Sequence, residues 1–142
     1  MTVKTLLHDK SDQLVQSLAP TASVLEAIRL MAERHIGSVL VSEAGQLVGI
    51  VTERDYARKV ILMGRSSSET KLSDVMSSPV LTVSSSDTIE HCMQLMTTNK
   101  IRHLPVLEGT SLIGMVSIGD LLKALLDLRQ REIEQLQQYI TG

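Results

Sequence analysis

Two short motifs of the same type, one in each half of the chain, place an aspartate three residues after a hydroxyl side chain. Thr52 and Asp55 form this pair in "GIVTERD", and Ser117 and Asp120 form it in "GMVSIGD". If a helix starts at the hydroxyl, its first amides and the positive end of its dipole suit a phosphate group. The aspartate lies about one helical turn further on the same face, where its carboxylate can accept hydrogen bonds from two ribose hydroxyls. The same spacing also fits a capping box, so each motif taken singly has a purely structural interpretation.

The two motifs belong to an internal repeat with an offset of 65 residues, the distance between Val24 and Ile89. Residues 24–55 align with residues 89–120 without a gap, so that Asp55 coincides with Asp120. A register of this length indicates a tandem repeat, in which neither copy can bury its own sheet and the two pseudo-symmetric copies pack as one globule. We therefore predict repeat 1 at residues 13–63, a linker at 64–78, repeat 2 at 79–126 and a helical extension at 127–142.

Each copy is predicted to be an α/β (α+β) unit with the order strand, helix, strand, strand, helix. The first helices have apolar residues at helical spacing, at Val24, Ile28 and Met31 and at Ile89, Met93 and Met96. Ser23 and Asp87 are their expected N-caps, each with a glutamate three residues later. Apolar runs predict strands at 38–42, 47–52, 103–107 and 112–117, further short strands near 14–19 and 80–83, and second helices from Glu53 and Ile118. Residues 71–76 are expected to add one helical turn within the serine-rich linker.

The composition limits the classes of function. Phe and Trp are absent and only two tyrosines are present, so the core is aliphatic and no aromatic platform exists for stacking bases. With a formal net charge of −2, direct binding of nucleic acid is not expected. No uncharged run approaches the ~18 residues of a membrane span, and the single cysteine fits a reducing compartment. We therefore expect a cytoplasmic protein without a membrane partner.

Two copies of strand-helix-strand-strand-helix, each ending in G-apolar-V-[ST]-x-x-D, resemble a tandem cystathionine-β-synthase (CBS) domain pair, or Bateman module. The resemblance covers residues 13–126, and the text at 50–59, 64–67 and 101–106 is similar to that of stand-alone bacterial and plant mitochondrial members. Such modules typically bind adenosyl ligands in clefts between the two repeats and report energy or redox state to a partner protein. The resemblance therefore implies a regulator that is not an enzyme, with AMP, ADP, ATP, S-adenosylmethionine or NAD(H) as its ligand.

The resemblance also implies which residues border the ligand, because in this family one repeat holds the base and the other the ribose and phosphate. One predicted cleft combines Ile36, Gly37 and Ser38, beside adenine, with Ser117 and Asp120. The other combines Ile101, Arg102 and His103 with Thr52, Arg54 and Asp55, and its Arg102 and His103 match positions that reach phosphates. Charged neighbours surround Asp55 but not Asp120, so we expect the Ser117/Asp120 cleft to be the AMP-type site. The other cleft is expected to take a different ligand or none.

Structural interpretations stay open for several of these residues. Ile36 and Ile101 also fit plain core positions, and Arg102 and His103 also fit a solvated strand end. Cys92 lies near an apolar helix stripe and is expected to be a buried structural thiol, while the histidines show no metal-ligand spacing. Two other functions stay open as well: a protein–protein interaction module with vestigial clefts, and an enzyme such as a nucleotide hydrolase. No nucleophile–base pair supports the enzyme.

The C-terminal segment is predicted to be one long helix, because residues 120–140 contain neither proline nor glycine. Apolar residues follow spacings of three and four along it, interrupted by Arg129, at Leu122, Leu126, Ile133, Leu136 and Ile140. Such a stripe needs cover from the first lobe, a second subunit or another partner. We expect a homodimer.

Overall fold

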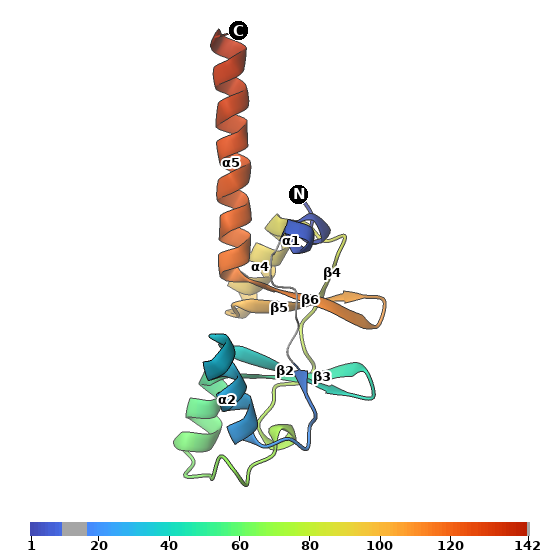
Figure 1. The fold of residues 1–142 in the computed structure, drawn as a ribbon, viewed down its shortest axis with the longest axis vertical. Helices are drawn as coiled ribbons and strands as arrows, with labels where there is room; N and C mark the ends of the chain where they lie inside the picture. The colour runs from blue at the N-terminus through green and yellow to red at the C-terminus, as the bar shows by residue number, and fades with distance from the viewer. Residues whose placement is uncertain (10–16, 142) are drawn as a thin grey trace. The chain divides into compact units, whose positions relative to one another are not determined.

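The protein is described by a computed structural model that covers residues 1–9 and 17–141. These residues form two compact units (Figure 1). The first-repeat unit comprises residues 17–81 and 110–112, and the second-repeat unit comprises residues 1–9, 82–109 and 113–141. Each unit contains a three-stranded sheet, so the predicted mixed α/β class is confirmed.

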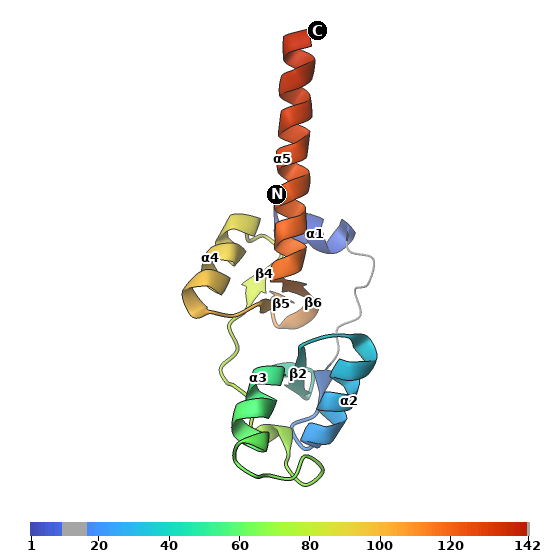
Figure 2. The ribbon, with the colours of Figure 1, turned by 90° about the vertical axis from the view of Figure 1, so that its left-hand side faces the viewer.

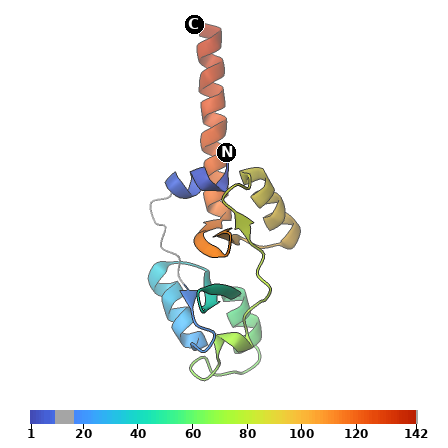
Figure 3. The same ribbon diagram turned by 90° about the vertical axis from the view of Figure 1, so that its right-hand side faces the viewer.

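The first-repeat unit has the predicted order of elements. They are β1 (Ser17–Leu18), α2 (Val24–Arg34), β2 (Ser38–Glu43), β3 (Gln46–Thr52), α3 (Glu53–Asp55), the π-helix η1 (Tyr56–Ile61) and the 3₁₀-helix η2 (Leu72–Asp74). Strand β2 pairs in parallel with β1 and antiparallel with β3. Helix α2 and the continuous α3–η1 helix lie side by side (Figures 2 and 3). Buried side chains from α2, β2, β3, η1 and η2 form an aliphatic core.

The second-repeat unit repeats this order with a longer last helix. Its elements are α1 (Val3–Asp9), β4 (Val83–Ser84), α4 (Ile89–Asn99), β5 (His103–Glu108), β6 (Ser111–Ser117) and α5 (Ile118–Thr141). The sheet order is β4-β5-β6, with β4 parallel to β5. Its core is again aliphatic and includes the single cysteine. The predicted long C-terminal helix is confirmed as α5, which is α-helical over 24 residues.

Helix α1 is the element that the sequence did not predict. It precedes the first repeat in the chain, yet Val3, Leu6 and Leu7 lie in the core of the second-repeat unit. Figure 2 shows α1 beside the base of α5. The amide of Val3 donates to the carbonyl of Asp87 at 2.9 Å, which fixes α1 to the segment that leads into α4.

The expected linker has the matching role in the other unit. Leu72 and Val75 are buried in the core of the first-repeat unit, at 0% and 1% exposure, although they precede the second repeat. The amide of Leu72 donates to the carbonyl of Ala22 at 2.9 Å, and Ala22 is the repeat counterpart of Asp87. Each unit is therefore completed by the segment that precedes the other repeat in the chain.

These exchanged segments explain the glycine that opens both repeated motifs. A Cβ atom on Gly49 would lie 2.5 Å from Sδ of Met76, and one on Gly114 would lie 2.8 Å from Cδ2 of Leu7. Met76 and Leu7 each belong to an exchanged segment, so the glycines in β3 and β6 leave room for the chain that crosses them.

The predicted N-cap of α2 is confirmed and that of α4 is wrong. Ser23 Oγ accepts from the amide of Glu26 at 3.2 Å, and the Glu26 carboxylate accepts from the amide of Ser23. In α4 the N-cap is Thr88, whose hydroxyl accepts from the amide of His91 at 3.1 Å. Asp87 instead accepts from the amide of Ser84 at 2.7 Å, which closes the preceding turn. The repeat offset supports the same conclusion, since Ser23 aligns with Thr88.

The core role of the presumed linker is testable by shortening one leucine. Leu72→Ala should lower the free energy of unfolding by about 2–5 kcal/mol, because it leaves a cavity in a fully buried site. Leu62→Ala is the matched control, since Leu62 is 77% exposed and its loss should change stability by less than about 0.5 kcal/mol. Urea denaturation measures both. Equal effects of the two substitutions would show that Leu72 is a passive connector residue.

Candidate functional site

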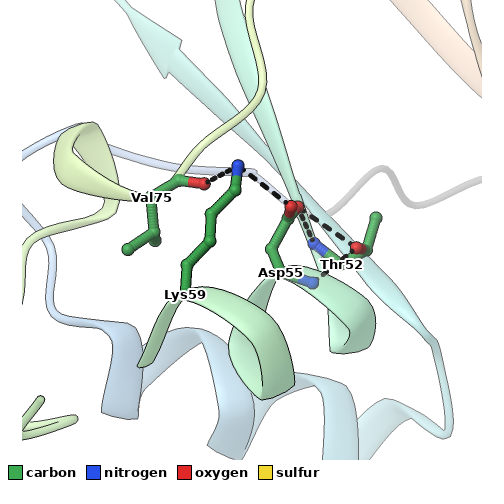
Figure 4. A network of polar contacts seen from close by, with 4 residues as sticks. All are labelled: Thr52, Asp55, Lys59 and Val75. Carbon is green, nitrogen blue, oxygen red and sulfur yellow. Dashed lines mark hydrogen bonds and ion pairs between the residues drawn. The ribbon is translucent and has the colours of Figure 1, made fainter. Parts of the chain in front are cut away.

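The first candidate site is the corner where β3 turns into α3. The amide of Thr52 donates to Asp55 Oδ2 at 2.9 Å, and the amide of Asp55 donates to Thr52 Oγ1 at 3.1 Å (Figure 4). Across the same corner the amide of Glu53 donates to the carbonyl of Gly37 at 3.1 Å. Ser38 is 4% exposed and pairs in register with Thr52. The segment before β2 and the start of α3 are thus joined into one rigid corner.

Asp55 in this corner also holds a lysine. Lys59 Nζ lies 3.2 Å from Asp55 Oδ1 and donates to the carbonyl of Val75 at 2.9 Å (Figure 4). The Asp55 side chain is only 12% exposed, and both of its oxygens have partners within the unit. The charge of this carboxylate is therefore largely compensated before any ligand arrives.

The second candidate site is the equivalent corner between β6 and α5. The amide of Ser117 donates to Asp120 Oδ2 at 2.9 Å, and the amide of Asp120 donates to Ser117 Oγ at 3.1 Å. The amide of Ile118 donates to the carbonyl of Arg102 at 2.9 Å. The three hydrogen bonds of the first corner therefore recur in the second, with donor–acceptor distances that differ by at most 0.2 Å.

The two corners differ in charge four residues after the aspartate. Lys59 aligns with Ala124, whose methyl side chain cannot form an ion pair. Arg102 of the second corner is exposed and aligns with Gly37 of the first. The second corner therefore carries a cation on the surface, while the first corner has a lysine directed onto its own aspartate.

Both motifs are capping boxes, as one interpretation of the sequence expected. The amides of Glu53, Asp55, Ile118 and Asp120 already have acceptors in the protein. The expectation that the first-turn amides are unoccupied is therefore wrong for these four. A phosphate at either corner would be held by side-chain donors, or would compete with the cap itself.

The remaining predicted site residues lie around the same two corners. Ile36 and Ile101 are half-buried and pack against the cores of their own units, so their structural role is present. Arg54 is exposed on α3, and His103 begins β5 half-buried. Each unit brings its own segment before the central strand, residues 36–38 or 101–103, to its own hydroxyl–aspartate pair. The combination of residues from different repeats stays a prediction from the sequence.

Cysteine and metal chemistry receive no support from the residues that the structure describes. No group of three or more His, Cys, Asp or Glu side chains among residues 1–9 and 17–141 is arranged to hold a metal ion. Cys92 is buried on α4, as predicted, and its burial, reinforced by the negative charge of Asp87, raises the pKa of the thiol to about 11. A thiol of that pKa is a poor nucleophile at neutral pH.

Known proteins match this chain over most of its length. The family model for the CBS domain matches residues 12–61 and 72–127. CBS domain-containing protein CBSX3, mitochondrial, from Arabidopsis thaliana is 42% identical over 125 residues, covering 84% of this chain and 61% of that protein. The chain thus spans less than two thirds of that relative.

Solved structures give the same comparison for the fold. A protein with CBS domains from Burkholderia ambifaria is 45% identical with a TM-score of 0.86, over 89% of this chain and 95% of that one. The CBS domain pair of protein MJ0100, solved with 5′-methylthioadenosine and S-adenosyl-L-methionine, has a TM-score of 0.77 over 88% of this chain and 95% of that one. It is 21% identical, so this likeness concerns the fold alone.

Within residues 1–9 and 17–141, no helix is both long enough and apolar enough to cross a bilayer.

The environment of Cys92 predicts a slow thiol. At pH 8, a pKa of about 11 leaves about one thiol in a thousand ionised, against about one in ten at the ordinary value of 9.0. An aromatic disulfide reagent should therefore react with the native protein about a hundredfold more slowly than with the protein in denaturant. The native rate should rise as the pH approaches 11, because the thiolate fraction grows. Equal rates in the native and denatured protein at pH 8 would contradict burial of this thiol.

Proposed function

We propose that this protein, which belongs to the CBS domain family and carries two copies of the domain, is a regulator that binds an adenosyl ligand. The predicted resemblance to a tandem CBS pair is confirmed by the family match and by the relatives that share it. The proposed ligand is AMP or a related molecule, ADP, ATP or NAD(H), and the bound state is signalled to a partner protein. The observation that carries the proposal is the hydroxyl–aspartate corner that recurs in both units.

The Ser117/Asp120 corner suits a nucleotide best. Its carboxylate provides an acceptor for ribose hydroxyls, and its serine hydroxyl provides a donor for phosphate. Gly37 and Ser38 are proposed to border the adenine, as the family resemblance implies.

The Thr52/Asp55 corner is proposed to have a different preference. Lys59 compensates the charge of Asp55, so a ribose diol would have to displace an ion pair and a cap. This corner therefore binds a ligand that does not depend on the carboxylate, or binds none. Ile101, Arg102 and His103 are its proposed additional contacts.

A second candidate function is supported by the completed capping boxes. If the four capping hydrogen bonds are the whole role of the motifs, the protein is an interaction module with vestigial clefts. A thermal-shift screen separates the two, because a ligand that binds only the folded state adds stability as RT ln(1 + [L]/Kd). We propose that the protein is not an enzyme, and incubation with AMP, ATP and NADH tests this by the absence of turnover. A cytoplasmic location likewise stays a prediction, since the Arabidopsis relative is named as mitochondrial.

We further propose a homodimer. The exposed apolar residues of α5, such as Leu126 at 70% and Ile140 at 80%, call for cover by another chain. Analytical ultracentrifugation at micromolar concentration should give about twice the chain mass of 15.6 kDa. A single species of the monomer mass would overturn the homodimer.

The ribose role of Asp120 is tested by one conservative substitution. Asp120→Asn keeps the shape of the side chain and removes its charge. A hydrogen bond to a charged group contributes about 1.5–3 kcal/mol, against about 0.5–1.5 kcal/mol for a bond between neutral groups. The affinity for AMP, measured by calorimetry, should fall about tenfold to a hundredfold. Asp55→Asn is the matched control and should leave AMP binding at the Ser117/Asp120 corner nearly unchanged, because Asp55 belongs to the other proposed cleft.

Two further measurements make this test specific. Urea denaturation of both variants shows whether the fold is intact, since each substitution also touches a capping box. 2′-Deoxyadenosine monophosphate lacks one ribose hydroxyl, so it should bind the natural protein more weakly than AMP and be discriminated much less by Asp120→Asn. If the folded Asp120→Asn variant binds AMP as tightly as the natural protein, the motif is a cap and nothing more.

A further inference from the structure

Helix α5 extends far beyond the packed part of its unit. Leu121 is its only buried residue, and every residue from Arg129 to Thr141 is exposed. Figure 1 shows the helix projecting from the rest of the second-repeat unit. At 1.5 Å per residue, its exposed part is roughly 20 Å long.

One face of this helix has the spacing of a coiled-coil seam. The seam consists of Leu122, Leu126, Arg129, Ile133, Leu136 and Ile140. These positions are separated alternately by four and three residues, which is the a/d pattern of a heptad repeat. Its five apolar members are between 47% and 80% exposed. A narrow stripe of this kind fits another helix better than the broad surface of a globular partner.

The flanking positions permit a second copy of the same helix. Of the residues that border the seam, Gln130 and Gln137 are uncharged, while Lys123 and Glu132 carry opposite charges. The only charge in the seam is Arg129, whose Nη1 lies 3.3 Å from Oε2 of Glu132 in its own helix. The orientation of the partner therefore depends on where Arg129 is placed.

Charge complementarity favours the antiparallel orientation. Two parallel helices in register would bring Arg129 against Arg129 of the partner subunit, two like charges in one layer. In the antiparallel register, Leu122 faces the partner's Ile140, and Leu126 faces the partner's Leu136. Arg129 then faces the partner's Ile133, next to the partner's Glu132, with which it can pair. Antiparallel helix dipoles also attract one another.

We propose that α5 pairs with α5 of a second copy of this chain as an antiparallel two-helix coiled coil through the seam. The inference deepens the homodimer proposed above, because it rests on self-association and names the surface and the orientation. It does not depend on which nucleotide the corners bind.

Single cysteine variants determine the orientation. Leu122→Cys and Ile140→Cys are prepared separately, mixed, allowed to exchange subunits and treated with a short bis-maleimide. Antiparallel pairing gives cross-linked dimer in the mixture and little in either variant alone. Parallel pairing gives cross-linked dimer in each variant alone and overturns the proposal, as does the absence of cross-linking in all three samples. The natural protein controls for Cys92, which is buried.

Surface substitutions test the seam without cross-linking. Leu136→Asp should weaken dimerisation about tenfold or more in sedimentation, whereas Gln138→Asp, which adds the same charge off the seam, should not. Arg129→Leu should strengthen dimerisation, because it places an apolar side chain opposite the partner's Ile133. If the dimer persists unchanged in Leu136→Asp and in Arg129→Leu, the seam proposal fails while the homodimer stands. If the natural protein is a monomer, both fail.

Discussion

The exchange of segments between the two repeats is the constraint on which the rest of the structure depends. Within the described part of the chain each sheet has three strands, one of which is two residues long, so a repeat alone leaves part of its core uncovered. Val3 and Leu7 close the core of the second-repeat unit, and Leu72 and Val75 close that of the first. The exchange also requires a glycine in β3 and in its counterpart β6. Met76 occupies the space that a Cβ atom on Gly49 would need, and Leu7 occupies the corresponding space at Gly114. The hydroxyl residues Thr52 and Ser117 follow those glycines by three positions, so one short motif contains both the packing glycine and the candidate site.

The corners place the capping hydrogen bonds and the proposed ligand contacts in the same side chains. The aspartate that would bind ribose accepts a hydrogen bond from the amide of the preceding Ser117 or Thr52, and the hydroxyl accepts one in return. A ligand bound at such a site would act on the start of a helix, because a new partner of the carboxylate would compete with the capping hydrogen bonds. In the second-repeat unit that helix is α5, which continues for 24 residues. A change at Asp120 would therefore act on a helix whose residues 129–141 are all exposed.

The sequence predicts most of the regular structure because the two copies confirm one another. All four long strands, both first helices and the start of each second helix lie within about two residues of the expected positions.

Other features are not predictable from the local sequence. The N-terminal helix is one of them, because seven residues with three buried positions carry little periodic signal. The serines around Leu72 and Val75 are typical of a linker, which hides the core role of these two residues. Asp87 and Thr88 are both suitable N-cap residues, so the local sequence does not distinguish the true N-cap of α4 from its neighbour. The ion pair of Lys59 was also missed, although its spacing of four residues from Asp55 is visible in the sequence. Contacts that join distant segments, such as Glu53 with Gly37, depend on the tertiary fold and have no local signal.

The exchanged segments give the chain the topology of two swapped partners. If each leading segment is assigned to the repeat that follows it, the two repeats have traded their N-terminal arms. That is the topology of a domain-swapped dimer whose two subunits are joined in a single chain. The two corners differ from one another, as at Lys59 and Ala124, while both halves depend on the traded arms. Neither half, cut at the serine-rich stretch, would carry away a complete core.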